Sequence, residues 1–340
     1  MIINITYLQN IWFILWCIIW GYYFILDSFT LGTGILSIKN INDDSIIELM
    51  IKTISPFWGG NQVWLILAAG GTFAAFPIIF SKMFTWLYLP MMLLLFGLII
   101  RGLSIELLHE DIEKGLRHIL KLSWFIGSLI ITIVLGLFFS NLFYGLLIGY
   151  NYNYYGTFFS LINKYTILGT LIFFMLVLLS GSLWLSNKIS DVISNEYWNI
   201  SKKIIVFIPI ILTLFIVASF NISNFSMNYN EHTLLYIIPI ISLVSSLINF
   251  YLIKNSKFLN NYKLLALILN FITIIFLLFT GFVTLHPNIL KSSIDISYGL
   301  SIYNSSSSEL TLTLMLFSSI IFVPIVITYQ LYSYFIFKEE

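Results

Sequence analysis

A short polar stretch that runs directly into an apolar one decides the fold, Trp58-Gly59-Gly60-Asn61-Gln62-Val63-Trp64 followed by Leu65 to Pro77. Lipid offers no hydrogen-bond partners to the amides of Asn61 and Gln62, so these side chains must bind or pack against something. Small residues then recur four positions apart, which lets another helix backbone come close: Gly70 with Ala74 and Gly71 with Ala75. We therefore expect residues 57–80 to form a buried central helix with a polar entrance.

The composition is that of a membrane protein. The chain is 59% hydrophobic and only 9% charged over 340 residues, whereas a soluble domain carries roughly a quarter charged residues. A helix needs about 20 apolar residues to cross the hydrocarbon, and nine runs are long enough, with only short loops between them. We predict one all-α polytopic domain, residues 1–340, with nine transmembrane spans near 8–36, 57–80, 84–107, 119–146, 160–186, 203–222, 233–253, 263–286 and 310–337.

Several functions are excluded by what the chain lacks. A net charge of +1 argues against nucleic acid as a partner, because binding needs a basic patch. The single cysteine, Cys17, allows neither an internal disulfide nor a thiolate metal cluster. None of the four histidines lies in the middle of a span with a facing partner, as transmembrane haem ligation would require. We expect this chain to ligate neither haem nor any other metal.

The distribution of basic residues predicts the orientation. The first apolar run follows no positively charged segment of the kind that precedes a cleavable signal, so we expect it to remain as a permanent span. With nine spans and the N-terminus outside, all but three of the 16 basic residues fall on the inner side, the exceptions being Lys82, Lys164 and Lys291. Positive residues stay cytoplasmic during insertion. We predict the N-terminus outside and the C-terminus inside.

This orientation brings the unusual polar residues together at the cytoplasmic side. The first span ends with Asp27 and Thr30, the second begins with residues 58–62, and the third carries Arg101 and, near its end, Glu106. Asp27 is either a proton-relay or ion-binding carboxylate or a partner of Arg101. Thr30 either extends a proton chain or bonds back to its own helix. Arg101 either snorkels to the interface or pairs with a carboxylate or a cofactor propionate.

Three blocks of sequence carry a resemblance to a known family. Residues 27–34 are similar to a family pattern D-G-F-D-L-G-x-G, and residues 58–65 and 69–77 are similar to W-D-G-N-[EQ]-V-W-L and A-G-G-x-F-A-A-F-P. Further matches in register include Tyr88-Leu89-Pro90, Arg101-Gly102, Pro287-Asn288-Ile289-Leu290 and Phe322-Val323-Pro324-Ile325-Val326. Over nearly its whole length the chain resembles subunit II of the cytochrome bd-type quinol oxidases, including their cyanide-insensitive relatives.

The resemblance implies an architecture and a set of partners. It implies two four-helix bundles plus one peripheral helix, paired by pseudo-twofold symmetry with a homologous haem-bearing subunit I in the bacterial cytoplasmic (inner) membrane. That partner would hold haem b and haem d, the quinol site and the centre that reduces oxygen to water. This chain would ligate no cofactor, would support the haem subunit, and is a candidate to bind a structural quinone or lipid and to conduct protons. A small accessory single-span subunit is a further candidate partner.

The resemblance also assigns residues. It marks Asp27, Thr30 and Arg101 as a proton path or a haem-supporting group, and the block at 58–64 as a contact to quinone, lipid or a subunit, through Trp58, Gly59, Asn61, Gln62 and Trp64. Two aspartates of the family are replaced here, by Thr30 and Gly59. Those acids are associated with proton supply and haem assembly, so the usual cytoplasmic proton route lacks both of them.

A transporter is the alternative function. A secondary transporter of a small solute binds its substrate at a broken helix, and Gly59-Gly60 would be the break. Such a protein should show repeat symmetry in its short or interrupted spans. The sequence offers only one break of this kind.

Overall fold

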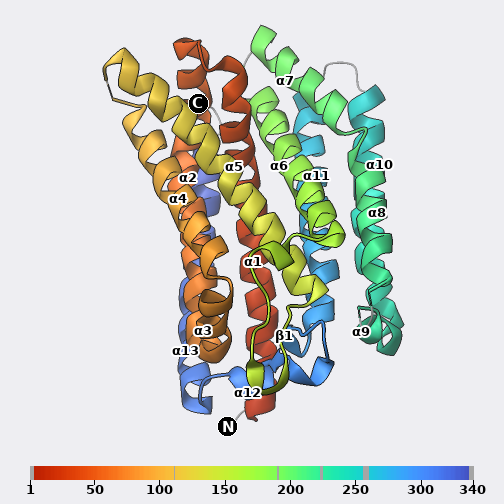
Figure 1. Cartoon of the computed structure of the whole chain (residues 1–340). Helices are drawn as coiled ribbons and strands as arrows, with labels where there is room; N and C mark the ends of the chain where they lie inside the picture. The colour runs from red at the N-terminus through yellow and green to blue at the C-terminus, as the bar shows by residue number, and fades with distance from the viewer. Residues whose placement is uncertain (1–3, 111, 190, 223–224, 256–259, 337–340) are drawn as a thin grey trace.

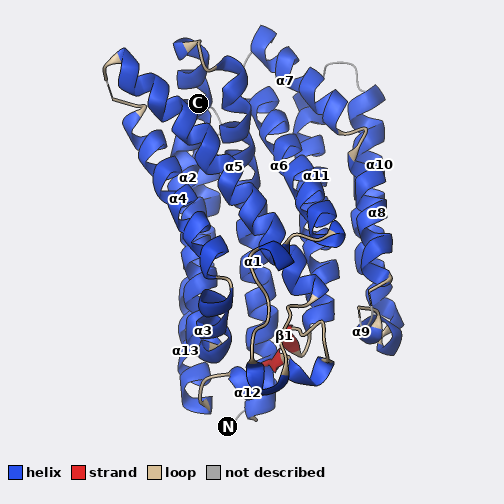
Figure 2. Cartoon of the chain, viewed as in Figure 1, coloured by secondary structure: helices blue, strands red, loops and turns tan. Residues whose placement is uncertain are grey.

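The chain forms a long bundle of helices with a small two-stranded sheet at one end (Figures 1 and 2). A computed structural model describes residues 4–110, 112–189, 191–222, 225–255 and 260–336. Its longer helices are α1 (Ile5–Leu36), α2 (Asp44–Ala75), α3 (Pro77–Trp86), α4 (Tyr88–Leu107), α5 (Lys114–Tyr144), α6 (Lys164–Lys188), α7 (Asp191–Ile204), α8 (Ile208–Phe220), α10 (Ile237–Asn255), α11 (Asn260–Leu285) and α13 (Glu309–Ile336).

The number of spans agrees with the prediction. Within the described residues, eight helices are long and apolar enough to cross a bilayer, and the bent pair α2–α3 raises this to nine. The start of α1 and the end of α13 lie at opposite ends of the bundle (Figure 1). The all-α, multi-span fold class predicted from composition is confirmed.

The helices group as two bundles. The first contains α1, α2, α4 and α5, and the second contains α6, α8, α10 and α11, with α1 also packed along α6 and α11. The last helix, α13, contacts mainly α1 and α2 and lies at the edge, as a peripheral helix should (Figure 1). Between α6 and α8 the amphipathic α7 lies at the end of the bundle that carries the C-terminus.

The second span differs from the prediction at both ends. Helix α2 begins at Asp44 instead of near residue 57, because Asp43 caps it by accepting a hydrogen bond from the Ile46 N–H at 3.1 Å. It continues through Pro56 and through Gly59-Gly60. It ends before Pro77, the first residue of α3, and the chain bends there by 116°. The break expected at Gly59-Gly60 is therefore absent, and the true bend lies near Phe76.

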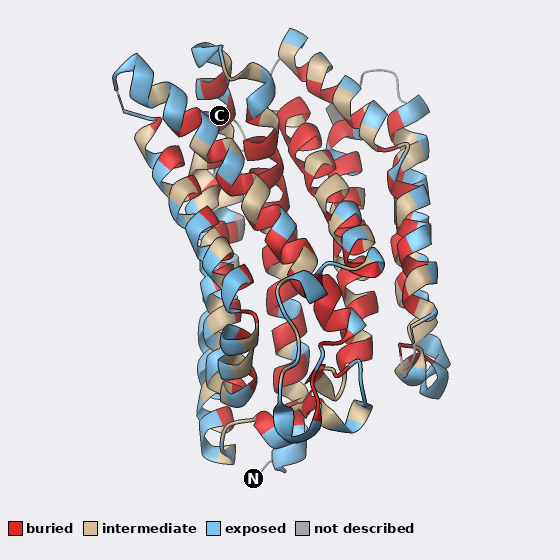
Figure 3. Cartoon of the chain, in the orientation of Figure 1, coloured by how far each residue is buried: buried red, intermediate tan, exposed pale blue. Residues whose placement is uncertain are grey.

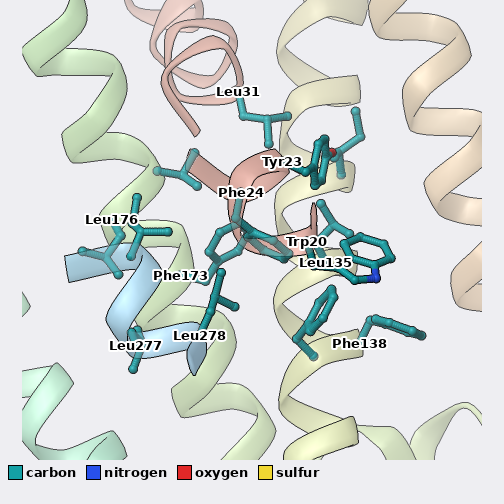
Figure 4. Close-up of a cluster of buried hydrophobic side chains, with 14 of the residues drawn as sticks. Trp20, Tyr23, Phe24, Leu31, Leu135, Phe138, Phe173, Leu176, Leu277 and Leu278 are labelled. Carbon is teal, nitrogen blue, oxygen red and sulfur yellow. The ribbon is translucent and has the colours of Figure 1, made fainter. Parts of the chain in front are cut away.

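The buried central helix is α1, not α2. The prediction for residues 57–80 is wrong for one face of α2, where Val63, Ile66 and Phe73 are 46%, 70% and 59% exposed. Figure 3 shows α1 largely buried in the middle of the bundle. Its aromatic side chains Trp20, Tyr23 and Phe24 pack against residues of α5, α6 and α11 (Figure 4).

A close approach of two backbones brings α1 and α6 together. A Cβ added to Gly181 would lie 2.3 Å from the carbonyl carbon of Gly32, so only glycine fits at this crossing. The small residues at Gly32-Thr33-Gly34 are thus packing features. This crossing fixes the C-terminal half of α1, which carries the candidate site.

Short elements close the end of the bundle that carries the N-terminus. Strand β1 pairs antiparallel with β2 beside the C-terminal end of α11. The short elements of the chain are η1 (Ser37–Asn40), η2 (Tyr150–Tyr152), η3 (Phe159–Leu161), α9 (Met227–Glu231), η4 (Thr233–Tyr236), β1 (Asn288–Leu290), η5 (Ile296–Tyr298), β2 (Leu300–Ser301) and α12 (Ile302–Ser305).

Candidate functional site

A buried ion pair joins α1 to α4. Arg101 Nη1 donates to Asp27 Oδ2 at 3.0 Å, and Nη2 donates to Asp27 Oδ1 at 2.8 Å. Both side chains are almost fully buried, with 2% and 1% of their surface exposed. This is the bidentate geometry that makes arginine–carboxylate pairs both strong and specific. Arg101 therefore does not snorkel to the interface. It pairs with the carboxylate.

Two hydroxyls complete the surroundings of the pair. Arg101 Nη2 also donates to Thr30 Oγ1 at 2.7 Å, and Thr30 donates to the Asp27 carboxylate and its backbone carbonyl. The phenol of Tyr23 donates to Asp27 Oδ2 at 3.1 Å. A buried carboxylate that receives donors on both oxygens is stabilised in its charged form. Thr30 thus bonds back to its own helix and also bridges the acid and the base.

A glycine contact places Arg101 inside the bundle. A Cβ on Gly127 of α5 would lie 2.8 Å from the Gly97 carbonyl and 2.9 Å from Arg101 Cβ, so α4 and α5 are as close as two backbones allow. The arginine side chain then crosses toward α1 instead of toward water. Its Nε is buried without a hydrogen-bond partner among the described residues. Glu106, expected in the same pocket, is exposed at the end of α4.

Two side chains of the polar stretch 58–64, the amide of Asn61 and the indole of Trp64, bind α13. Asn61 donates to the Leu26 carbonyl at 2.7 Å and accepts from Gln330 Nε2 at 3.0 Å and from the Tyr334 hydroxyl at 3.2 Å. The Trp64 indole donates to Gln330 Oε1. The sequence reasoning did not single out Gln330 or Tyr334 for this role. The sequence feature that could have indicated this contact is the single amide side chain, Gln330, within the apolar run 310–337.

The remaining members of the stretch lie on two sides of α2. The amide of Gln62 lies beside Asp27, close enough to interact with its carboxylate. The ring of Trp58 lies 3.6 Å from where a Cβ would stand on Gly102 of α4. Gly59 is exposed, with no atom within 4 Å of such a position. The structure therefore gathers Asp27, Thr30, Arg101 and Gln62 in one place and leaves Gly59 on the surface.

No described residues are arranged to hold a metal. Among them there is no group of three or more histidine, cysteine, aspartate or glutamate side chains that could bind an ion. Fold and site together define a polytopic helical membrane protein whose first bundle is organised around a buried, hydroxyl-lined ion pair. The chemistry available at this pair is charge stabilisation and proton exchange.

Comparisons with known proteins agree with this class. Residues 8–337 match the family model of cytochrome bd terminal oxidase subunit II. The chain is 28% identical to a probable cytochrome oxidase subunit 2 of Haemophilus influenzae, over 98% of this chain and 94% of that protein. It is 27% identical to a cytochrome bd ubiquinol oxidase subunit 2 of Bacillus subtilis, over 98% and 96%. The bd oxidase structure of Geobacillus thermodenitrificans has the same fold, with a TM-score of 0.78 at 15% identity over 98% of this chain and 99% of that one.

The chain belongs to the cytochrome bd terminal oxidase subunit II family. It is a subunit of a bd-type terminal oxidase, an enzyme complex of respiratory electron transport in the bacterial inner membrane. The enzyme class expected from the sequence, a quinol:oxygen oxidoreductase, is confirmed at this level. The transporter alternative is not favoured, and α2 runs without a break through Gly59-Gly60, where a solute was expected to bind.

Proposed function

We propose that this chain is the subunit without haem in a complex that oxidises quinol and reduces oxygen to water, with haem b and haem d held by a homologous partner subunit. The positions of the histidines support this division of labour. His109 lies just beyond the end of α4, with its Nε2 2.6 Å from Ser55 Oγ. His286 lies just beyond the end of α11, with its Nε2 2.8 Å from Asn10 Oδ1. Such positions do not fit the ligation of haem iron within the membrane.

The partner docks, in this proposal, on the exposed side of α2 and α4. We call this surface the α2–α4 face, and it comprises Gly59, Val63, Ile66, Gly70, Phe73, Leu95, Ile99 and Leu103. Apolar side chains suit lipid as well as protein. Gly70 and Gly71, however, have no atom within 4 Å of a Cβ position in this chain. Small residues on a membrane face allow a second helix to approach closely, which lipid does not need.

A substitution at Gly70 tests the docking face. Gly70→Leu adds bulk where this chain has open space, so the chain itself should fold, but the approaching helix would be pushed away. We expect at least about a tenfold lower yield of the two-subunit complex, corresponding to about 1.4 kcal/mol. Copurification of the partner measures this. Leu247→Phe on α10, also exposed but on the second bundle, is the control, and equal losses for both variants would contradict the proposal.

The geometry favours a haem-supporting role for Asp27, Thr30 and Arg101 over a proton-carrying one. A proton carrier must exchange between charged and neutral forms, whereas Asp27 receives four donors and pairs bidentately with an arginine. We propose that the pair holds α1 and α4 in the arrangement that the haem subunit requires. Proton conduction through Asp27 is the second candidate, supported by the polar amide of Gln62 beside the carboxylate.

One double variant separates these roles. Asp27→Asn with Arg101→Gln removes both charges and leaves neutral groups that can still hydrogen-bond. If the pair is structural, haem content and oxygen reduction should both recover relative to Asp27→Asn alone. If Asp27 carries protons, haem content should recover while turnover and proton uptake from the inside stay low. The second outcome would overturn the haem-supporting role.

The third proposal concerns a structural quinone. We propose the apolar cavity of about 260 Å³ that is lined by residues of α1 to α5. Trp20 lines it, and its indole N–H is buried with no acceptor among the described residues, so a quinone carbonyl would satisfy it. Trp20→Phe should lower the amount of quinone that copurifies with the complex, and an unchanged amount would contradict this assignment.

The membrane orientation of the chain and the small single-span accessory subunit stay predictions. We propose the N-terminus outside and the C-terminus inside, on the excess of basic residues at the end of the bundle that carries α7. Cysteine labelling of whole cells at Ser297, an exposed position at the other end, tests this with an impermeant reagent. Labelling only after the membrane is opened would reverse the orientation.

A further inference from the structure

A second polar pocket lies far from the ion pair, at the end of the bundle that carries β1. Its volume is about 320 Å³, and it lies between the end of α5, the turn after α8 and the segment 291–296. The lining residues are Phe143, Tyr144, Asn221, Ile222, Lys291, Ser292, Ser293, Ile294, Asp295 and Ile296. This part of the bundle is on the opposite side from α13 and α4 (Figure 1). The pocket is therefore separate from the proposed docking face.

Three hydrogen-bond donors of the pocket have no partner among the residues that the structure describes. The ammonium of Lys291, the amide of Asn221 and the hydroxyl of Tyr144 make no hydrogen bond or ion pair with any described residue. Tyr144 instead stacks its ring on Tyr165, with centroids 5.7 Å apart. Because Lys291, Asn221 and Tyr144 all line the same pocket, they together offer donors to a ligand that supplies several acceptor oxygens.

The backbone beneath these donors is held in place. The Leu146 N–H donates to the Lys291 carbonyl at 2.8 Å, and the Ser293 N–H donates to the Leu146 carbonyl at 2.9 Å. The Ser292 hydroxyl donates to the Ile148 carbonyl at 2.6 Å. Three hydrogen bonds thus hold the segment that carries Lys291 against the chain that follows α5. The backbone of the pocket is therefore fixed.

The pocket carries one charge of each sign, and the two are not paired with each other. The Asp295 carboxylate accepts hydrogen bonds from the N–H and hydroxyl of Ser297 at 2.8 and 2.7 Å, and it is exposed. Lys291 is partly buried. Burial lowers the pKa of its ammonium to about 8, because the charged form loses water without gaining a counter-ion. An anion beside Lys291 would raise that pKa again and so would bind more tightly to the charged form.

We propose that this pocket binds the head group of a zwitterionic phospholipid, with the phosphate on Lys291, Asn221 and Tyr144 and the amine at Asp295. Phosphatidylethanolamine has this charge pattern: a phosphodiester followed by a primary ammonium. Apolar side chains at the same pocket, Phe143 and Ile222, suit the glycerol and the start of the acyl chains. The pocket lies where spans α5 and α8 end, which is the level of lipid head groups.

The test uses the purified oxidase complex, stripped of lipid in detergent. Four probes are added separately: dioleoyl phosphatidylethanolamine, dioleoyl phosphatidylglycerol, dioleoylglycerol and inorganic phosphate. Native mass spectrometry counts bound lipid, and the thermal unfolding midpoint reports stabilisation. We expect phosphatidylethanolamine to bind best, because phosphatidylglycerol lacks the amine, dioleoylglycerol lacks the phosphate, and inorganic phosphate lacks both the amine and the tails. Equal stabilisation by inorganic phosphate would identify a free-anion site and overturn the proposal.

Variants assign the effect to this pocket. Lys291→Gln should weaken phosphatidylethanolamine binding by about ten- to a hundredfold, the effect of losing a charged hydrogen bond, and remove one lipid from the count. Lys164→Gln, an exposed lysine at the start of α6 outside the pocket, should change neither. Asp295→Asn should abolish the preference for phosphatidylethanolamine over phosphatidylglycerol. An unchanged lipid count in Lys291→Gln, with an intact haem spectrum, would contradict the proposal.

Discussion

In the first and last spans, the relation between hydrophobicity and burial is the reverse of that in soluble proteins. Helix α13 is the more hydrophobic of the two, yet only 6% of its most apolar segment is buried, whereas most of α1 is buried. Figure 3 shows the contrast directly, with α1 buried at the centre and the edge of the bundle exposed. Apolar side chains on the outside of a membrane protein face the lipid. The hydropathy of a helix therefore does not indicate how deeply the helix is buried.

Polar residues mark the inside instead. Helix α1 carries Asp27, Ser28 and Thr30, each about 1% exposed or less, and every one of them has a hydrogen-bond partner on another helix or on a neighbouring turn. Among its described residues helix α13 has one comparably buried polar residue, Gln330, and that residue bonds to Asn61 and Trp64 of α2. The interior of this protein is therefore recognised by its polar contacts and close backbone crossings.

The largest effect should come from filling the crossing of α1 and α6. Gly181→Val places a side chain 2.3 Å from the backbone of Gly32, and no rotamer can relieve a clash with backbone. We expect no folded chain in the membrane fraction, as judged by size-exclusion chromatography in detergent. Gly115→Val, at a position with open space near the start of α5, should be recovered normally. Recovery of both variants would show that the two helices do not cross this closely.

An intermediate effect should follow from detaching α13. Gln330→Leu leaves the buried indole N–H of Trp64 without its acceptor, at about 1–3 kcal/mol, whereas Asn61 keeps its hydrogen bond from Tyr334. We expect a lower unfolding midpoint and faster cleavage of α13 by protease. Thr328→Leu, two residues before Gln330 and exposed, is the matched control. Identical melting curves for Gln330→Leu and the parent would mean that this amide does not anchor the helix.

Hydropathy was enough to predict most of the spans, and it failed at one. Residues 44–56 contain Asp44, Glu48, Lys52 and Pro56, which read as a polar loop, yet they form the first turns of α2. The structure explains this by an Asp43 cap and by the ion pairs of Asp44 with Lys121 and Arg117 across to α5. Contacts between helices distant in sequence override local propensity, and such contacts cannot be read from one chain.

The sequence supplied the members of the site but not their arrangement. Asp27 and Arg101 stood out as ionisable residues in spans, and their alternatives stayed open because pairing depends on the Gly97–Gly127 contact between α4 and α5. Residues 58–64 stood out as a polar block. The structure divides them between α13, the ion pair and the exposed surface, because a helix points successive side chains in different directions.

The smallest effect should come from the outer face of α13. Ile320 is 61% exposed, so Ile320→Ala removes few contacts within the chain and should change stability by no more than about 0.5 kcal/mol. Thermal unfolding of the purified complex measures this. A loss of more than about 2 kcal/mol, typical of a buried Ile→Ala change, would mean that another subunit covers α13.

The central claim is that a buried polar contact, not hydrophobicity, organises the first bundle, and a double-mutant cycle on Asp27 and Arg101 tests it most directly. Unfolding of the complex is measured for Asp27→Asn, Arg101→Gln and the double variant, with the exposed pair Lys39 and Glu196 as the control cycle. We predict single losses of about 3–5 kcal/mol at the buried pair, a double loss well below their sum, and less than about 1 kcal/mol of coupling at the exposed pair. Additive losses at Asp27 and Arg101, or losses as small as those of the control, would contradict the account.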